Sequence, residues 1–384
     1  MIGGMLRVAD VLCAMEGIAP TRCAESWDNV GLIVGDAQRE IGTDAVILLT
    51  IDLTPAVVDE AIEAGAKCII AYHPPIFSAV KRFVASTPRA AALLRCAEAG
   101  VAVYSPHTAL DAAPGGVADW LLEMACGKNA GDQVALSAHL ARDLLSTHKI
   151  VTMVPCAKKG ALERVRSALA RAGAGEIGAY TECSFASKGT GSFVGGEGAH
   201  PTVGKAGQLE FVEEVRLEMV CPGDRLAEVI AVLREVHPYE ETAFDVFERA
   251  DVPERMVGAG RVGTLAQPQD AKKIADRLRL ALNVPVVKLA QASDAPVARA
   301  AVCPGSGGSL MDDVVRAGAQ VFVTGEMTHH DVLSALDRGV SVILAGHTET
   351  ERGYMTVLAD RLTSADARLR VAVSAQDEPP LRSI

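Results

Sequence analysis

The sequence predicts an α/β protein in which two α/β halves form one core and enclose an inserted, ferredoxin-like α+β domain. Apolar runs of strand length alternate with helical patterns in the first and last thirds of the chain. The middle third instead follows the order β-α-β-β-α-β of the ferredoxin-like motif. At 384 residues the chain is also too long for one compact core.

In the first third, continuous apolar runs recur at 46–51, 68–71 and 101–104. Patterns rich in Ala, Val and Leu with helical spacing alternate with them at 57–64, 90–99 and 117–124. Strands that are apolar throughout are typical of a sheet covered by helices on both faces. We therefore expect a largely parallel, buried sheet in this part of the chain.

The last third repeats this alternation. Its expected strands lie at 300–303, 320–323, 342–345 and 369–373. Its expected helices lie at 310–317, 332–336 and 354–362. This alternation predicts a second α/β layer structure.

The middle third has expected strands at 150–154, 180–185, 215–220 and 243–247. Helical patterns occupy 162–172 and 226–236, and a Gly-rich, flexible loop is expected over 189–207. These elements predict three parts: residues 1–147 as the first half of the core, 148–250 as the insert and 251–384 as the second half.

Composition excludes several classes of protein. The net charge of −11 repels phosphate backbones, and aromatic residues make up only 4%, so we expect no direct binding to nucleic acid. No apolar run reaches the length of a membrane span, and the first residues lack a signal pattern, so a cytoplasmic protein without membrane contact is expected. The nine scattered Cys contain no C-x-x-C, which indicates reduced thiols.

Three histidines follow the ends of expected strands: His73, His107 and His347. The carboxyl ends of strands are where open α/β sheets build their sites. Asp111 and Glu351 each come four residues after one of these histidines, so a helical backbone would place each pair on one face. Imidazole and carboxylate together suit zinc, iron, manganese, cobalt or nickel. This set is the minimum for a two-metal centre that activates water for hydrolysis, although each pattern alone is common by chance.

Segment 324–331 (TGEMTHHD) also follows an expected strand. One interpretation is a group that contacts the metal ligands or the substrate, and His330 is its main candidate. The other is a polar helix start capped by Thr328 or Asp331.

Three further segments have structural alternatives. Segment 304–309 (PGSGGS) is either a phosphate or carboxylate pocket or a tight turn, and without a following Lys it is no P-loop. Segment 26–32 is either part of a pocket or, more often for such residues, a turn in which Asp28 or Asn29 bonds the backbone. Segment 237–242 (HPYEET) predicts a turn. The histidines without a partner pattern are expected at the surface: His139, His148 and His200.

Five motifs together resemble the NGG-interacting-factor-three-like dinuclear metal-centre family, whose members are often called type 2 GTP cyclohydrolase I homologues. They occur in the family's order over most of the chain, and only jointly are they specific. The motifs are 26–32 (SWDNVGL), 72–77 (YHPPIF), 107–111 (HTALD), 324–326 (TGE) with His330, and 346–351 (GHTETE). The middle module resembles the insert of some members, which is similar to PII-type and divalent-ion-tolerance proteins.

The resemblance implies a homohexameric toroid with two divalent metal ions per subunit facing its interior. The residues that match the family's ligands are His73, His107, Asp111, His347 and Glu351, with Glu351 as the bridge. Many members have a second His where this chain has Tyr72, so the second metal position is weaker, empty or held by other ligands. Tyr72 and His330 are candidates to contact the ligands, and no catalytic residue is assigned.

We therefore expect a dinuclear metal-dependent hydrolase that acts on a nucleotide or another phosphate-bearing small molecule. The family's name implies opening of the GTP purine ring, whereas phosphoester hydrolysis is the more natural chemistry for this ligand set. The alternative is a metal-binding regulatory or scaffold protein, or a metal chaperone, that signals through its PII-like insert. A weaker alternative is a transcription-associated adaptor that contacts other proteins.

Overall fold

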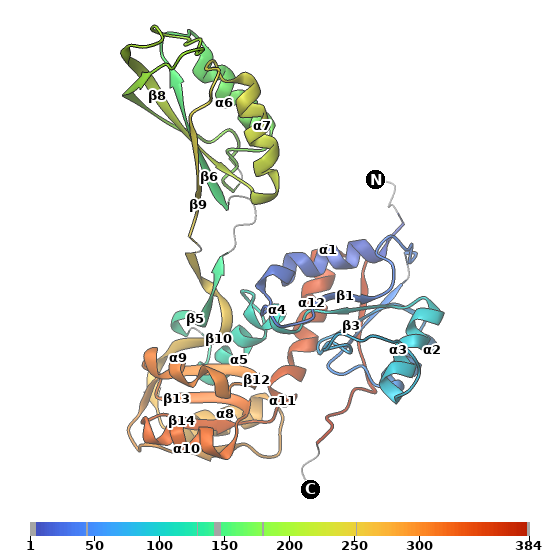
Figure 1. Ribbon diagram of the computed structural model, residues 1–384. Coiled ribbons are helices and arrows are strands. Elements are labelled where there is room, and N and C mark those ends of the chain that lie inside the picture. The colour runs from blue at the N-terminus through green and yellow to red at the C-terminus, as the bar shows by residue number, and fades with distance from the viewer. Residues whose placement is uncertain are drawn as a thin grey trace. The chain divides into compact units, whose positions relative to one another are not determined.

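The computed structural model describes residues 5–43, 45–128, 130–141, 147–178, 180–250 and 252–381. It is a mixed α/β structure with three sheets (Figure 1). The chain divides into two compact units. One contains residues 1–139 and 254–384, which we call the core unit, and the other contains residues 140–253, which we call the insert.

The first sheet of the core unit has the order β1-β4-β3-β2-β15. Strands β2, β3, β4 and β15 are parallel, and β1 is antiparallel to β4. The last strand comes from the far end of the chain, so this sheet needs both ends of the sequence. The bounds are β1 (Gly31–Val34), β2 (Val46–Thr50), β3 (Ala66–Ala71), β4 (Ala102–Ser105) and β15 (Arg370–Val373).

Helices cover both faces of this sheet, as continuous apolar strands require. Ile47 and Leu49 pack with α1 and α12 on one face, and Leu48 packs with α2 and α3 on the other (Figure 1). Helices α2 and α3 each begin at a Thr whose hydroxyl accepts a backbone N–H, followed by Pro in the first turn. The bounds are α1 (Val8–Ile18), α2 (Pro55–Glu63), α3 (Pro88–Ala99) and α12 (Tyr354–Ala365).

The second sheet of the core unit has the order β11-β14-β13-β12-β10-β5, and its central strands β12, β13 and β14 are parallel. The strand bounds are β5 (Gly131–Ala141), β10 (Val252–Gln269), β11 (Lys288–Ala290), β12 (Val297–Ser306), β13 (Val321–Glu326) and β14 (Ser341–Leu344). Val321 and Val323 pack against α5 and α8, whereas Phe322 packs against α9 and α10. The helix bounds are α5 (Val117–Cys126), α8 (Ala271–Ala281), α9 (Met311–Arg316) and α10 (His329–Asp337).

Two short helices, α4 (His107–Ala112) and α11 (Glu349–Arg352), follow strands of the two sheets. The end of α4 is fixed by Arg261, a fully buried arginine on β10. Its guanidinium donates to the carbonyl of Ala112 at 2.8 Å and to Asp119 Oδ1 at 2.5 Å. A cation is favourable at a helix carboxyl end, and this one binds α4 to both β10 and α5.

The insert contains one antiparallel sheet of order β7-β8-β6-β9. Helices α6 and α7 pack on one face of it, around Val165, Leu217 and Val229. Along the chain the elements run β-α-β-β-α-β. The bounds are β6 (His148–Pro155), α6 (Ala161–Arg171), β7 (Phe185–Val194), β8 (Leu209–Cys221), α7 (Leu226–Val236) and β9 (Phe244–Glu248).

The strand expected at 180–185 is misplaced. β7 begins at Phe185 and runs into the segment 189–207 that was predicted to be a flexible loop. Its glycines pair with β8, Gly189 opposite Glu214 and Gly191 opposite Val212. Pairing along a whole neighbouring strand outweighs the low strand propensity of Gly. Within the described residues, no helix is both long and apolar enough to cross a membrane.

Candidate metal centre

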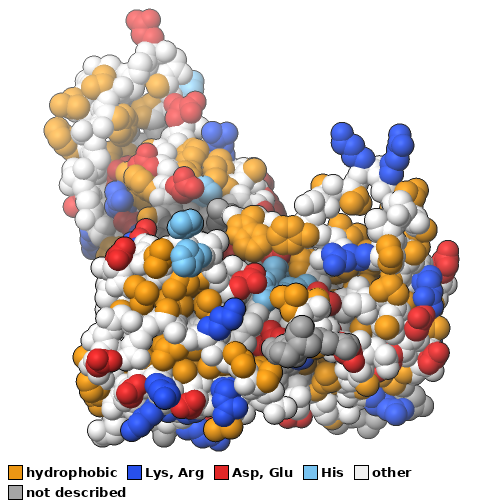
Figure 2. All heavy atoms as spheres, turned by 90° about the horizontal axis from the view of Figure 1, so that it is seen from below, with side chains coloured by type: hydrophobic (Ala, Val, Ile, Leu, Met, Phe, Trp, Pro, Cys, Tyr) orange, Lys and Arg blue, Asp and Glu red, His pale blue; other side chains and the backbone are white. Residues whose placement is uncertain are grey.

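The three predicted histidines meet at one cavity of about 650 Å³ in the core unit. His73 follows β3, His107 begins α4 after β4, and His347 follows β14. Figure 2 shows histidine side chains beside acidic and hydrophobic ones where this face of the molecule is hollowed. The carboxyl ends of strands from both sheets therefore supply the polar side chains, as predicted from their positions in the sequence.

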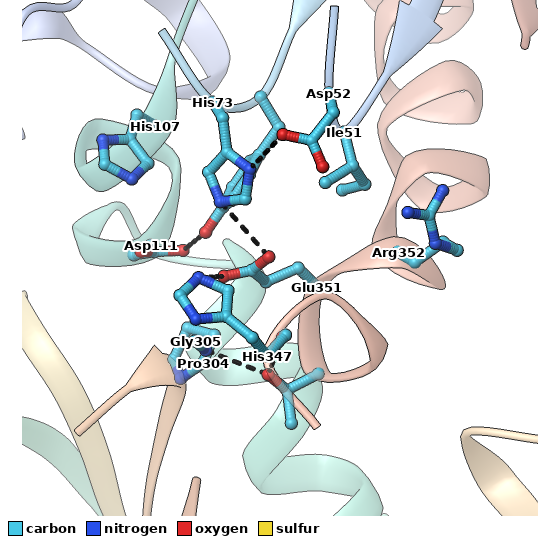
Figure 3. A network of polar contacts seen from close by, with 12 residues as sticks. Ile51, Asp52, His73, His107, Asp111, Pro304, Gly305, His347, Glu351 and Arg352 are labelled. Carbon is cyan, nitrogen blue, oxygen red and sulfur yellow. Dashed lines mark hydrogen bonds and ion pairs between the residues drawn. The ribbon is translucent and has the colours of Figure 1, made fainter. Parts of the chain in front are cut away.

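Three predicted ligands form a compact group: His73, His347 and Glu351. Their ligand atoms lie within 4.8 Å of one another. Glu351 stands between the two rings (Figure 3), with Oε2 at 3.5 Å from His73 Nε2 and Oε1 at 3.5 Å from His347 Nε2. This group is a candidate metal site.

Each imidazole is held by a carboxylate on its other nitrogen. His73 Nδ1 lies 3.1 Å from Asp52 Oδ1, and His347 Nδ1 lies 2.9 Å from Glu326 Oε1. A carboxylate only accepts hydrogen bonds, so Nδ1 of each ring carries a hydrogen, and Nε2 is the nitrogen that faces Glu351. Such carboxylate–histidine pairs orient metal-binding histidines and raise their basicity.

The residues present fit a divalent ion. Glu351 is 2% exposed, and within the described residues its Oε2 has no hydrogen-bond partner, which is costly for a buried carboxylate. Ligand atoms about 2.1 Å from a shared tetrahedral ion stand about 3.4 Å apart, close to the two 3.5 Å separations. A Cβ on Gly305 would lie 2.6 Å from Glu351 Oε1 and 3.2 Å from His347 Nε2, so this Gly keeps the space open.

His107 and Asp111 line the same cavity but stand outside the compact group. The His107 ring lies 5.5 Å from the His73 ring, and its Nδ1 lies 2.8 Å from Asp28 Oδ1. Its φ of +28° is strained for a residue other than Gly, a feature common at functional sites. Tyr72 donates a hydrogen bond of 2.5 Å to Asp111 Oδ1.

Burial and nearby charges set the protonation of these groups. Burial opposes the charge on His73, but the hydrogen bond to Asp52 and the adjacent Glu351 carboxylate outweigh it and raise its pKa to about 10. Burial raises the pKa of Asp111 to about 7. Burial and the adjacent Asp111 carboxylate raise the pKa of Tyr72 well above its usual value, so Tyr72 is a neutral hydrogen-bond donor here.

The segment 324–331 divides between its two interpretations. Asp331 and Thr328 form a capping box at the start of α10, as the structural alternative predicts. His330 is exposed and does not line the cavity, whereas Glu326 of the same segment contacts His347. The residue of this segment that orients His347 is thus Glu326 and not His330.

Several residues that support the site were not identified as functional from the sequence. Asp28 accepts hydrogen bonds from the backbone N–H groups of Asn29 and Thr108, as the turn alternative predicts, but its buried carboxylate also accepts one from His107. Asp52 carried no signal beyond its place after a strand. His139, expected at the surface, is half-buried in the cavity wall, with Nε2 at 2.9 Å from Glu25 Oε1 and Nδ1 at 3.0 Å from the Cys23 carbonyl. No local pattern links residues more than 110 positions apart.

Comparison with known proteins places the whole chain in one family. Residues 6–380 match the family model described as Duf34/NIF3 (NGG1p interacting factor 3). The chain is 36% identical over 342 residues to a Bacillus subtilis protein named GTP cyclohydrolase 1 type 2 homolog, covering 88% of this chain and 87% of that one. It is 32% identical to the Bos taurus NIF3-like protein 1, covering 97% and 92%.

Two solved structures extend the likeness to the fold. A Bacillus cereus protein related to NIF3 aligns with a TM-score of 0.70 at 30% identity over 100% of both chains. A Staphylococcus aureus protein aligns with a TM-score of 0.79 at 26% identity over 99% of both chains. The chain therefore belongs to the DUF34/NIF3 family, as its five motifs indicated.

Proposed function

We propose that the protein is a metal-dependent hydrolase of a nucleotide or another phosphate-bearing small molecule. The observation that carries the proposal is the convergence of two carboxylate-oriented imidazoles on the buried carboxylate of Glu351, whose Oε2 has no other partner among the described residues. A divalent ion bound there would polarise a phosphoryl oxygen and lower the pKa of bound water.

The residues of the chain would divide the work. His73, His347 and Glu351 would hold the first ion, while His107 and Asp111 would contribute to a second, with Glu351 as the bridge. Tyr72 would keep Asp111 in place through its hydroxyl. The metal would be zinc, iron, manganese, cobalt or nickel, the ions that suit imidazole and carboxylate.

The test is elemental analysis of protein purified without affinity metals, followed by a metal-dependent screen of nucleotides and phosphoesters on the same sample. We expect stoichiometric metal and turnover, and loss of both in His347→Ala. The matched control is His330→Ala, an exposed histidine outside the cavity, which should retain both. Protein without stoichiometric metal, together with unchanged activity in His347→Ala, would overturn the proposal.

A second candidate is a regulatory metal-binding protein that responds to a ligand in its insert. The observation that favours it is a cavity of about 490 Å³ in the insert, bordered by 191–196 and by Tyr239 and Glu241. Metal-loaded protein would then yield no product from the nucleotide panel. In either case we propose a homohexamer, which sedimentation analysis of the full chain would test.

A further inference from the structure

Two large aromatic side chains stand exposed in the wall of the cavity that contains the candidate metal site. Trp27 is 58% exposed and Phe77 is 55% exposed, and both line the cavity. Their ring centroids lie 5.9 Å apart with the planes inclined at 49°. Burial of this aromatic surface would stabilise the protein, so its exposure in the wall of a cavity indicates a role in binding.

The pair is directly connected to the candidate metal site. The ring of His107 lies 6.2 Å from that of Trp27 and 6.5 Å from that of Phe77, both at 76°. His107 in turn lies 5.5 Å from His73. A molecule that rests against the aromatic pair would therefore have its other end next to the predicted ligands.

Hydrogen bonds of neighbouring residues fix the two loops that carry these aromatic side chains. Asn29 Nδ2 donates to the Ile76 carbonyl at 2.6 Å, which joins the loop of Trp27 to the loop of Phe77. On the other side of Trp27, the Glu25 backbone N–H donates to Thr108 Oγ1 at 3.0 Å. Asp28 accepts from His107, so the residue next to Trp27 is fixed to the same histidine. A wall that is positioned before the ligand arrives loses little entropy on binding.

The charge of the cavity adds a second requirement. Among the described residues that line it, Arg89 is the one lysine or arginine, and its side chain is exposed. The carboxylates Glu25 and Asp52 are each paired with a histidine. An anionic group on the ligand would thus have Arg89 and the bound metal as its attractive partners.

We infer that Trp27 and Phe77 form a ring-binding subsite, so that the substrate is a planar heteroaromatic compound with an anionic group, of the nucleoside-phosphate class. The inference rests on the proposed function, because it takes the metal site as the place where the anionic end binds. The aromatic faces stack on the ring, while Arg89 and the metal hold the anion.

Binding of guanosine 5′-monophosphate, adenosine 5′-monophosphate and ribose 5-phosphate to the metal-loaded full chain tests the subsite by calorimetry. We expect Trp27→Ala and Phe77→Ala each to weaken nucleotide binding by about 5- to 150-fold. Binding of ribose 5-phosphate and the metal content should stay unchanged. Trp27→Phe keeps a ring and should retain most of the affinity. The matched control is Phe185→Ala, which changes a phenylalanine of the insert that is 64% exposed, and this variant should bind as the unaltered protein does.

The outcomes separate this inference from the proposed function. Nucleotides that bind no better than ribose 5-phosphate, or that bind equally well to Trp27→Ala and Phe77→Ala, would overturn the subsite even if the protein is an active metal enzyme. Ring-dependent binding without turnover would support the subsite and reject the hydrolase.

Discussion

His73 in the core unit and His237 in the insert both lie near acidic residues, but of these two only His73 has a ring nitrogen available to a metal ion. In the core unit, Asp52 holds Nδ1 of His73, and Nε2 faces Glu351. In the insert, His237 is buried, and its Nε2 donates to the Met153 carbonyl at 2.9 Å. Its Nδ1 accepts the Tyr239 N–H at 3.2 Å.

The difference lies in the partner of each ring nitrogen rather than in the residue types nearby. Backbone groups satisfy both nitrogens of His237, and burial lowers its pKa, so it is a neutral structural residue. Two carboxylates, Asp52 and Glu351, face the ring of His73 and raise its pKa against the effect of burial. A metal ion could replace the proton of His73, whereas His237 has no place for one.

The largest expected effect comes from filling the space beside Glu351. Gly305→Ala should lower metal affinity by at least about 100-fold, because the new Cβ would lie 2.6 Å from Glu351 Oε1. Metal titration of the purified variant measures this.

Gly318→Ala is the matched control for this change. Gly305 and Gly318 have φ of +63° and +69°, so both variants carry similar backbone strain, of about 1–2 kcal/mol. A Cβ on Gly318 has nothing within 4 Å, so this variant should bind metal normally. Equal affinities in the two variants would contradict the proposed position of the site.

A smaller effect is expected from the orienting carboxylates. Asp52→Asn should weaken metal binding by about 10- to 100-fold, because the amide can donate to Nδ1 and favour the wrong tautomer of His73. The control is Glu214→Gln in the insert, where the carboxylate accepts from the Tyr239 hydroxyl at 2.7 Å. If both variants bind metal as the unaltered protein does, His73 is not a ligand.

The smallest effect is a pH dependence that distinguishes the two histidines. With its pKa raised to about 10, metal-free His73 is protonated at pH 7, and a metal must displace that proton. The apparent affinity should therefore fall about tenfold for each pH unit from 9 to 7, and the slope should flatten in His73→Gln. Competition with a chelator, corrected for its own protonation, measures the slope, and its absence would argue against His73.

The pKa shift of His237 has the opposite sign to that of His73. Its pKa is lowered in the folded state, so the unfolded chain binds the proton more readily. Its contribution to stability is present above the ordinary pKa of about 6.5 and declines as the pH falls below it. Because backbone groups occupy both of its ring nitrogens, His237 should contribute nothing to the pH dependence of metal binding.

Local patterns predicted much of the fold. The apolar runs that became β2, β3 and β4 are recognisable because a strand buried on both faces needs no polar positions. Strands β1, β5, β10 and β11 were not predicted. β10 interrupts its apolar positions with Glu254, Arg255 and Arg261, and the burial of Arg261 depends on carbonyls from α4 that lie far away in the sequence.

The sequence by itself determined that His73, His107 and His347 follow strands, and that Asp111 and Glu351 come one helical turn later. Spacing along the chain is sufficient for this, because strand and helix periods are local. Only the tertiary structure decided which imidazoles have a free nitrogen. That choice depends on Asp28, Asp52 and Glu326, which are brought to the rings from segments 21 to 79 positions away, and such contacts leave no periodic signal in the sequence.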